Sequence, residues 1–116
     1  MEPIVRTPRP IPDYLLDLQH DDRVGPVEAR RIILEAIGRA ADHDDICPSS
    51  EILNELTGHA SLSAAVYQVR QLEARGHIVV ERFQRSRNVL VVATGRRTRP
   101  SRETLPHWRA RGGRKR

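Results

Sequence analysis

Three stretches in the middle of the chain carry apolar residues at the spacing of a helix. The first stretch starts at Pro26, after Gly25, and its apolar stripe consists of Ala29, Ile33, Ala36, Ile37 and Ala40. The stripes of the second and third stretches consist of Ile52, Leu53 and Leu56, and of Leu62, Ala65, Val69 and Leu72. This pattern predicts three short amphipathic helices whose apolar faces form a common core.

Residues that favour helix ends set the limits of these stretches. Ser49 and Ser61 stand where the second and third helices begin, and serine is a favoured N-cap. Gly58 and Gly76 stand where the same helices end, a common position for glycine. Acids at a helix C-terminus oppose its dipole, so we place the acidic residues 42–45 in the loop after the first helix. A short turn then joins the second and third helices.

The segment after the third helix has the character of a β-hairpin. Residues 78–83 and 89–94 are rich in β-branched residues, and the sequence QRSR lies between them. No Asn-Gly or Asp-Gly pair marks a two-residue turn, so we expect a loop of four residues or slightly more. The predicted fold class is α+β, with three helices followed by a two-stranded hairpin.

The two ends of the chain differ from this middle part. Residues 1–12 contain four prolines and no periodicity, which predicts an extended arm, and Tyr14, Leu15 and Leu18 allow one or two helical turns after it. Residues 96–116 carry nine basic residues against one acidic residue, which is typical of a disordered tail that binds a polyanion. We therefore expect an arm in residues 1–25, one domain in residues 26–95 and a basic tail in residues 96–116.

Composition narrows the class of protein. A chain of 116 residues with 3% aromatic residues indicates one small domain with an aliphatic core. Its single cysteine, Cys47, excludes an internal disulfide, and no run of 18 apolar residues is present. We therefore expect a cytoplasmic protein that does not enter a membrane. The net charge of +5 lies in the tail, because residues 26–95 carry eight arginines against nine acids.

The outward face of the third helix, residues 61–75, is the strongest candidate for function. With the apolar stripe turned inward, helical geometry places Ser63, Tyr67 and Gln71 outside, with Gln68 and Arg70 at the borders. Gln bonds adenine, and Ser bonds phosphates or base edges. The helix N-terminus at Ser61 suits a phosphate. The arginines of the hairpin and of the segment after it suit the DNA backbone or the minor groove; they are Arg82, Arg85, Arg87, Arg96 and Arg97.

Residues 26–94 resemble a winged helix–turn–helix domain of bacterial transcription regulators. The closest likeness is to the DNA-binding domains of the SOS-response repressor and of the multiple-antibiotic-resistance-type regulators. The residues that carry it are Pro48, Ser49, Glu51, Ile52, Leu56, Gly58, Ser61, Val69, Leu72, Glu73, Arg75, Gly76 and Ile78. The turn in residues 57–60 is one residue longer than is usual in the repressor, and we expect no effector domain after residues 26–94.

This resemblance implies sequence-specific binding of double-stranded DNA by a small regulator, with residues 61–75 in the major groove and the hairpin as the wing. Tyr67, Gln68, Gln71 and Ser63 would contact bases, and Arg70 would contact phosphate. The hairpin arginines would anchor the wing. One half-site rarely supplies enough specificity, so we also expect a homodimer.

Alternative functions remain open at this point. Winged helix domains also serve as protein adaptors; here the acidic residues 42–45 and the apolar segment 14–18 would be the docking surface, and the basic tail would be a non-specific nucleic-acid anchor. The charge of −1 over residues 26–95 favours this alternative unless the tail or a dimer supplies the attraction to DNA. Binding of RNA or single-stranded DNA usually requires exposed aromatic side chains on which bases stack, and this chain has few aromatic residues. The chain has no phosphate loop, nucleophile elbow or firm set of metal ligands, so we expect no enzyme, cofactor, metal or small-molecule substrate. Cys47 is expected to be a small buried residue rather than a redox sensor.

Overall fold

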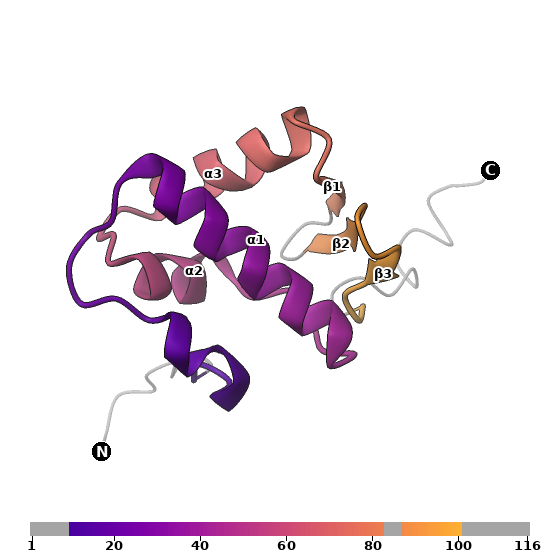
Figure 1. Ribbon diagram of the computed structural model, residues 1–116, viewed down its shortest axis with the longest axis horizontal. Helices are drawn as coiled ribbons and strands as arrows, with labels where there is room; N and C mark the ends of the chain where they lie inside the picture. The colour runs from indigo at the N-terminus through magenta and orange to yellow at the C-terminus, as the bar shows by residue number, and fades with distance from the viewer. Residues whose placement is uncertain (1–9, 83–86, 101–116) are drawn as a thin grey trace, which may run out of the picture.

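A computed structural model describes residues 10–82 and 87–100 of the chain (Figure 1). A short 3-10 helix, η1, and three α-helices precede a small antiparallel sheet, which makes the fold α+β as predicted. The helices are η1 (Asp13–Leu18), α1 (Pro26–Asp42), α2 (Ser50–Thr57) and α3 (Leu62–Ala74). The strands are β1 (Ile78–Arg82), β2 (Arg87–Val91) and β3 (Arg96–Arg97).

The helices begin where the capping residues predict, but α1 continues through Asp42, which was predicted to lie in the loop after it. Pro26 is the first residue of α1 after Gly25. The Ser49 hydroxyl caps α2 by accepting a hydrogen bond from the Ile52 amide at 3.2 Å. Gly58 ends α2 in the left-handed region, with φ of 74°. Ser61 is the N-cap residue of α3 as predicted, but it does not act as a side-chain cap. Its hydroxyl forms a hydrogen bond with the hydroxyl of Ser63 at 2.7 Å and with no amide of α3.

The sheet has one strand more than the predicted hairpin. β1 pairs with β2 from Ile78 opposite Val91 to Arg82 opposite Arg87, so four residues separate the two strands. The chain then turns at residues 92–95 and returns as β3, with Leu90 opposite Arg97. The segment 96–97 lacks β-branched residues, and so its sequence carries no strand signal.

The core lies where α1 crosses the middle of the molecule (Figure 1), with α2 and η1 toward one end, the sheet toward the other and α3 along one side. The predicted stripe of α1 is fully buried, and Ile32 joins it. Ile52, Leu53 and Leu56 of α2 and Ala65, Val69 and Leu72 of α3 are buried as predicted. The sheet completes the core with Ile78, Val89 and Val91.

The packed part of the chain extends beyond residues 26–95 on both sides. In η1, Leu15 and Leu18 are buried against α1 and α2. At the other end, the buried Thr98 hydroxyl accepts from the Val89 amide at 3.0 Å and donates to Asn88 Oδ1 at 3.1 Å. The core therefore recruits the end of the predicted arm and the start of the predicted tail. Residues 1–9 and 101–116, which hold the rest of both, lie outside the described residues.

The segment between η1 and α1 also completes the end of α2. The amide of His20 donates to the Leu56 carbonyl at 2.9 Å, and the amide of Val24 donates to the Thr57 carbonyl at 3.1 Å. Both acceptors belong to the last turn of α2, where carbonyls lack helical partners. None of the described helices combines the length and apolar character needed to cross a bilayer.

Candidate nucleic-acid interface

The inner face of α3 fixes which of its residues reach solvent. Ala65, Val69 and Leu72 are buried against α1 and α2, and Gln68 is buried with them at 6% exposure. The prediction that Gln68 borders the outward face is therefore wrong. Position 68 follows Ala65 by three residues and precedes Leu72 by four, which places it on the same side of the helix as both.

The outward face of α3 consists mainly of Ser63, Tyr67, Arg70 and Ala74, all exposed. Tyr67 is the most prominent of them, with 57% of its surface exposed. Gln71 is half-buried at one border of this face. Because the inner stripe includes Gln68, the outward face is centred on Tyr67 and Ala74 rather than on Tyr67 and Gln71. Ser63, Tyr67 and Arg70 lie outward as predicted.

The N-terminus of α3 has an open end and a cap from another helix. The hydroxyl of the N-cap residue Ser61 bonds to the hydroxyl of Ser63 and caps no amide of the first turn. The amide of Ala65 instead donates to Oδ1 of Asn54, which is buried in α2, at 3.1 Å. Amide groups at a helix N-terminus and the helix dipole favour an anion such as a phosphate.

Asn54 is a positioning residue that the sequence analysis did not identify. It joins the second helix to the third with one hydrogen bond buried in their contact, and it is 4% exposed. Its Nδ2, like Oε1 of Gln68, has no hydrogen-bond partner among the described residues. The available signal was a polar residue directly between Leu53 and Leu56 on a short apolar helix.

Arg82 connects the sheet to α3. Its guanidinium donates to both carboxylate oxygens of Glu73, at 2.9 and 3.2 Å, and this hydrogen bonding lowers the pKa of Glu73. Glu73 is the only acidic residue of α3, so the ion pair neutralises the one charge on this helix that would repel a phosphate. Arg82 remains about half exposed, with 46% of its side chain accessible.

Arg87 has an internal contact rather than a free side chain. Its guanidinium donates to the Pro48 carbonyl at 3.1 Å and to the Ser50 hydroxyl at 3.4 Å. These contacts tie β2 to the start of α2, so the structure gives the predicted wing anchor a role in packing. Its Nε is buried without a partner in the described part of the chain.

The remaining predicted arginines differ in their surroundings. Arg96 forms a loose, exposed ion pair with Asp42 at 3.7 Å. Arg97 is exposed on β3, at the edge of the sheet. Arg85 lies outside the described residues. On α3, Arg70 and Arg75 are exposed and form no hydrogen bond or ion pair within the part of the chain that the structure describes.

The acidic loop after α1 packs against η1. The ring of Tyr14 stacks on His43, with centroids 4.1 Å apart and planes within 7°, and the Tyr14 hydroxyl donates to Asp45 Oδ2 at 2.6 Å. The adaptor hypothesis used this loop and η1 as a docking surface for a partner, but these contacts show that the loop and η1 pack against each other.

Burial raises the pKa of the nearby Cys47 thiol, which disfavours the reactive thiolate. Across residues 10–82 and 87–100, no three His, Cys, Asp or Glu side chains gather as a metal site.

Comparison of the chain with protein-family models, with curated proteins and with solved structures finds no match. Function is therefore inferred from the chain's own residues and their geometry.

Proposed function

We propose that this protein binds double-stranded DNA as a small winged helix–turn–helix regulator, with α3 as the helix that enters the major groove. The observation that carries the proposal is the exposed face of α3. It presents Ser63, Tyr67 and Arg70 on a helix whose opposite side is buried and whose N-cap residue, Ser61, caps no amide with its hydroxyl. A helix packed on one side, with polar and basic side chains exposed on the other, suits the reading of a DNA groove.

The dimensions of α3 suit this role. Its 13 residues span about 20 Å at the rise of an α-helix, and the major groove admits a helix of this kind. The turn before it starts at Gly58, and Asn54 fixes the first turn of α3 to α2. In this proposal β1 and β2 form the wing, and β3 widens it.

The electrostatics favour the same face. Arg70 and Arg75 add free positive charge to α3, while Arg82 neutralises Glu73. Residues 26–95 as a whole carry a charge of −1, so most of the attraction to DNA comes from residues 96–116 with their charge of +8. We assign base contacts to Ser63, Tyr67 and Gln71, and phosphate contacts to Arg70 and the N-terminus of α3. Gln68 is removed from the proposed base contacts because it is buried.

Selection of bound duplexes from a random pool tests this proposal. We expect one sequence to be enriched, and Gln71→Ala to relax the preference at one position by about 1–3 kcal/mol. Gln19→Ala is the matched control, because Gln19 is an exposed glutamine outside α3. If the wild-type protein enriches no sequence, the proposal fails and the adaptor hypothesis, which the negative charge of the middle part favours, takes its place.

A further inference from the structure

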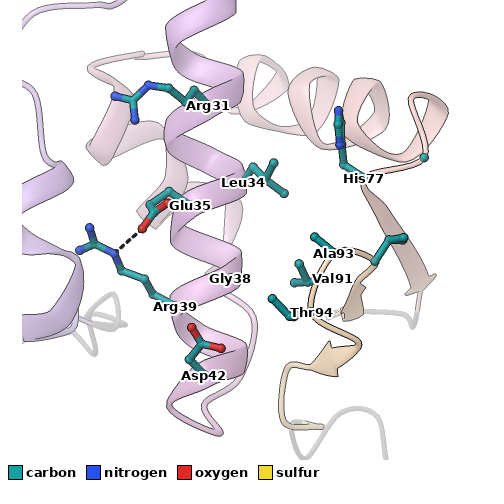
Figure 2. A pocket seen from close by; sticks show the side chains of 12 residues that line it. Arg31, Leu34, Glu35, Gly38, Arg39, Asp42, His77, Val91, Ala93 and Thr94 are labelled. Carbon is teal, nitrogen blue, oxygen red and sulfur yellow. Dashed lines mark hydrogen bonds and ion pairs between the residues drawn. The ribbon is translucent and has the colours of Figure 1, made fainter.

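A groove runs along the side of α1 that faces the sheet. Its volume is about 420 Å³, and its far wall is the segment of residues 91–94 that turns from β2 toward β3 (Figure 2). Leu34 points into the groove from α1, opposite Val91 and Ala93 (Figure 2). A second hollow of about 230 Å³ continues it between α1 and the end of α3. Val27 and Val92, which line the two hollows, are 74% and 50% exposed. Within residues 10–82 and 87–100, nothing covers these apolar side chains.

Four residues of α1 form one ridge beside this groove. Arg30, Leu34, Gly38 and Asp42 follow one another at intervals of four, so they lie in one row along the helix. Leu34 and Gly38 are half-buried, and a Cβ atom added at Gly38 would meet nothing within 4 Å. Glycine in the interior of a helix is unfavourable relative to alanine. No neighbour among the described residues explains its presence.

The ridge is complementary to itself. The midpoint between Leu34 and Gly38 lies at the level of position 36 of the helix, and the midpoint between Arg30 and Asp42 lies at the same level. A two-fold axis through that point places a second copy of α1 antiparallel to the first. Leu34 of one copy then faces Gly38 of the other, and Arg30 of one copy faces Asp42 of the other. We infer that two copies of this chain associate in this way, with Leu34 of each copy packed over Gly38 of the other and Arg30 paired with Asp42.

The charges on this ridge are available for such pairing. Arg30 forms no hydrogen bond or ion pair within the described residues, and the ion pair of Asp42 with Arg96 is long and exposed. The neighbouring charges are already matched on the same helix, Arg31 with Glu28 and Glu35 with Arg39. Glu35 and Arg39 also line the groove, and their side chains are joined there by an ion pair (Figure 2). A second copy therefore meets one unmatched cation at one end of the ridge and one loosely paired anion at the other.

The interface does not depend on the proposed DNA function. The groove is lined by no residue of α3, and the second hollow is lined by Leu72 and by Arg75 at the end of the helix, so Ser63, Tyr67 and Arg70 stay free in the dimer. A single helix pair gives an interface at the small end of those seen in stable complexes. We therefore expect a weak dimer, whose dissociation constant has to be measured at high protein concentration.

Charge reversal with analytical ultracentrifugation tests the inference. Arg30→Asp and Asp42→Arg each place like charges across the axis at two symmetric sites, and each is expected to weaken self-association by at least about tenfold. An equimolar mixture of these two variants restores both ion pairs, and we expect it to form a one-to-one dimer with the wild-type affinity. Circular dichroism of each variant confirms that it is folded.

Gly38→Leu provides a second, uncharged probe. A Cβ atom at Gly38 meets nothing within 4 Å, and Gly38 borders the open groove, so this variant is expected to fold and to lose the dimer. A monomeric wild-type protein at the highest concentration reached would overturn the inference. So would a dimer whose affinity is unchanged in the charge variants, or a mixture of the two that fails to associate.

Discussion

Replacing Gly58 by alanine tests how the segment before α1 holds the end of α2. Gly58 adopts φ of 74°, and an added Cβ would lie 2.5 Å from the carbonyl oxygen of Asp22 and 2.8 Å from the amide nitrogen of Arg23. Both atoms belong to the backbone of a segment that is held by hydrogen bonds from the His20 and Val24 amides to carbonyls in the last turn of α2. The alanine therefore has to move backbone that is hydrogen-bonded on both sides of the contact.

The expected cost has two parts. The left-handed conformation costs an alanine about 1–2 kcal/mol, and relieving the backbone contact costs about 1–3 kcal/mol more. Gly76→Ala is the matched control, because Gly76 has φ of 82° but would have no atom within 4 Å of the added Cβ. Only the conformational part applies there. We expect Gly58→Ala to lower the free energy of unfolding by about 2–5 kcal/mol and Gly76→Ala by about 1–2 kcal/mol.

Urea denaturation followed by circular dichroism measures both values. In a domain of this size 1 kcal/mol corresponds to about 4–8 °C in Tm, so a thermal scan resolves the difference as well. Equal destabilisation by the two variants would refute the packing of residues 20–25 against the α2–α3 turn. Gly95→Ala, also at a positive φ with open space, checks that the control value is general.

Three further predictions concern the contacts of α3 and the charged tail. Asn54→Ala removes the bond to the Ala65 amide, so we expect a loss of about 1–2 kcal/mol in urea denaturation and faster hydrogen exchange at that amide. Arg82 lowers the pKa of Glu73, so their ion pair stabilises the fold above the ordinary carboxyl pKa, and this contribution is lost as the pH falls through the lowered value. Wild-type and Arg82→Gln stabilities are therefore expected to differ slightly near neutral pH and to converge in acid, and a constant difference across the titration would contradict this. Deletion of residues 101–116, which spares β3 and Thr98, is expected to weaken binding to random duplex and to flatten its salt dependence; an unchanged salt slope in fluorescence anisotropy would show that the tail does not contact DNA.

The helices were predictable because their signals are local. The spacing of apolar residues in α1 and the serine and glycine at the ends of α2 act within one or two turns, and each is found where it was expected. The hairpin was predictable for the same reason, since Ile78 and Val89 belong to β-branched runs that pair in register. Local chemistry therefore determined the type and order of these elements.

Contacts between distant segments were not predictable from the same signals. Gln68 was placed at the border of the outward face from the apolar stripe of α3 alone, but α1 and α2 cover the side of α3 on which it lies. Asn54 was not predicted as a capping residue, because its side chain accepts a hydrogen bond from the amide of Ala65, 11 residues later. Only the packing of α2 against α3 brings the two groups together. Arg87 likewise reaches back 39 positions to the Pro48 carbonyl, and a charge pattern alone does not distinguish it from a free arginine.

The extent of the fold was underestimated for a related reason. η1 is too short to be stable alone, and its burial depends on α1 and α2. β3 has only two residues, and it is held by pairing with β2 and by the buried Thr98. Both segments gain their stability from tertiary contacts: Tyr14, Leu15 and Leu18 predict helical turns but not the helices they pack against, and residues 96–97 carry no strand signal.

The most direct test of the central claim is to map the DNA-contacting surface by NMR. In a titration of ¹⁵N-labelled protein with the duplex recovered by selection, we predict the largest amide shifts at Ser61, Ser63, Tyr67 and Arg70, on the first turns and outward face of α3. Residues along the groove beside Leu34 and Gly38 should shift little at a fixed oligomeric state. Shifts concentrated on that groove, with the amides of α3 unchanged, would contradict the assignment of α3 as the DNA-reading helix.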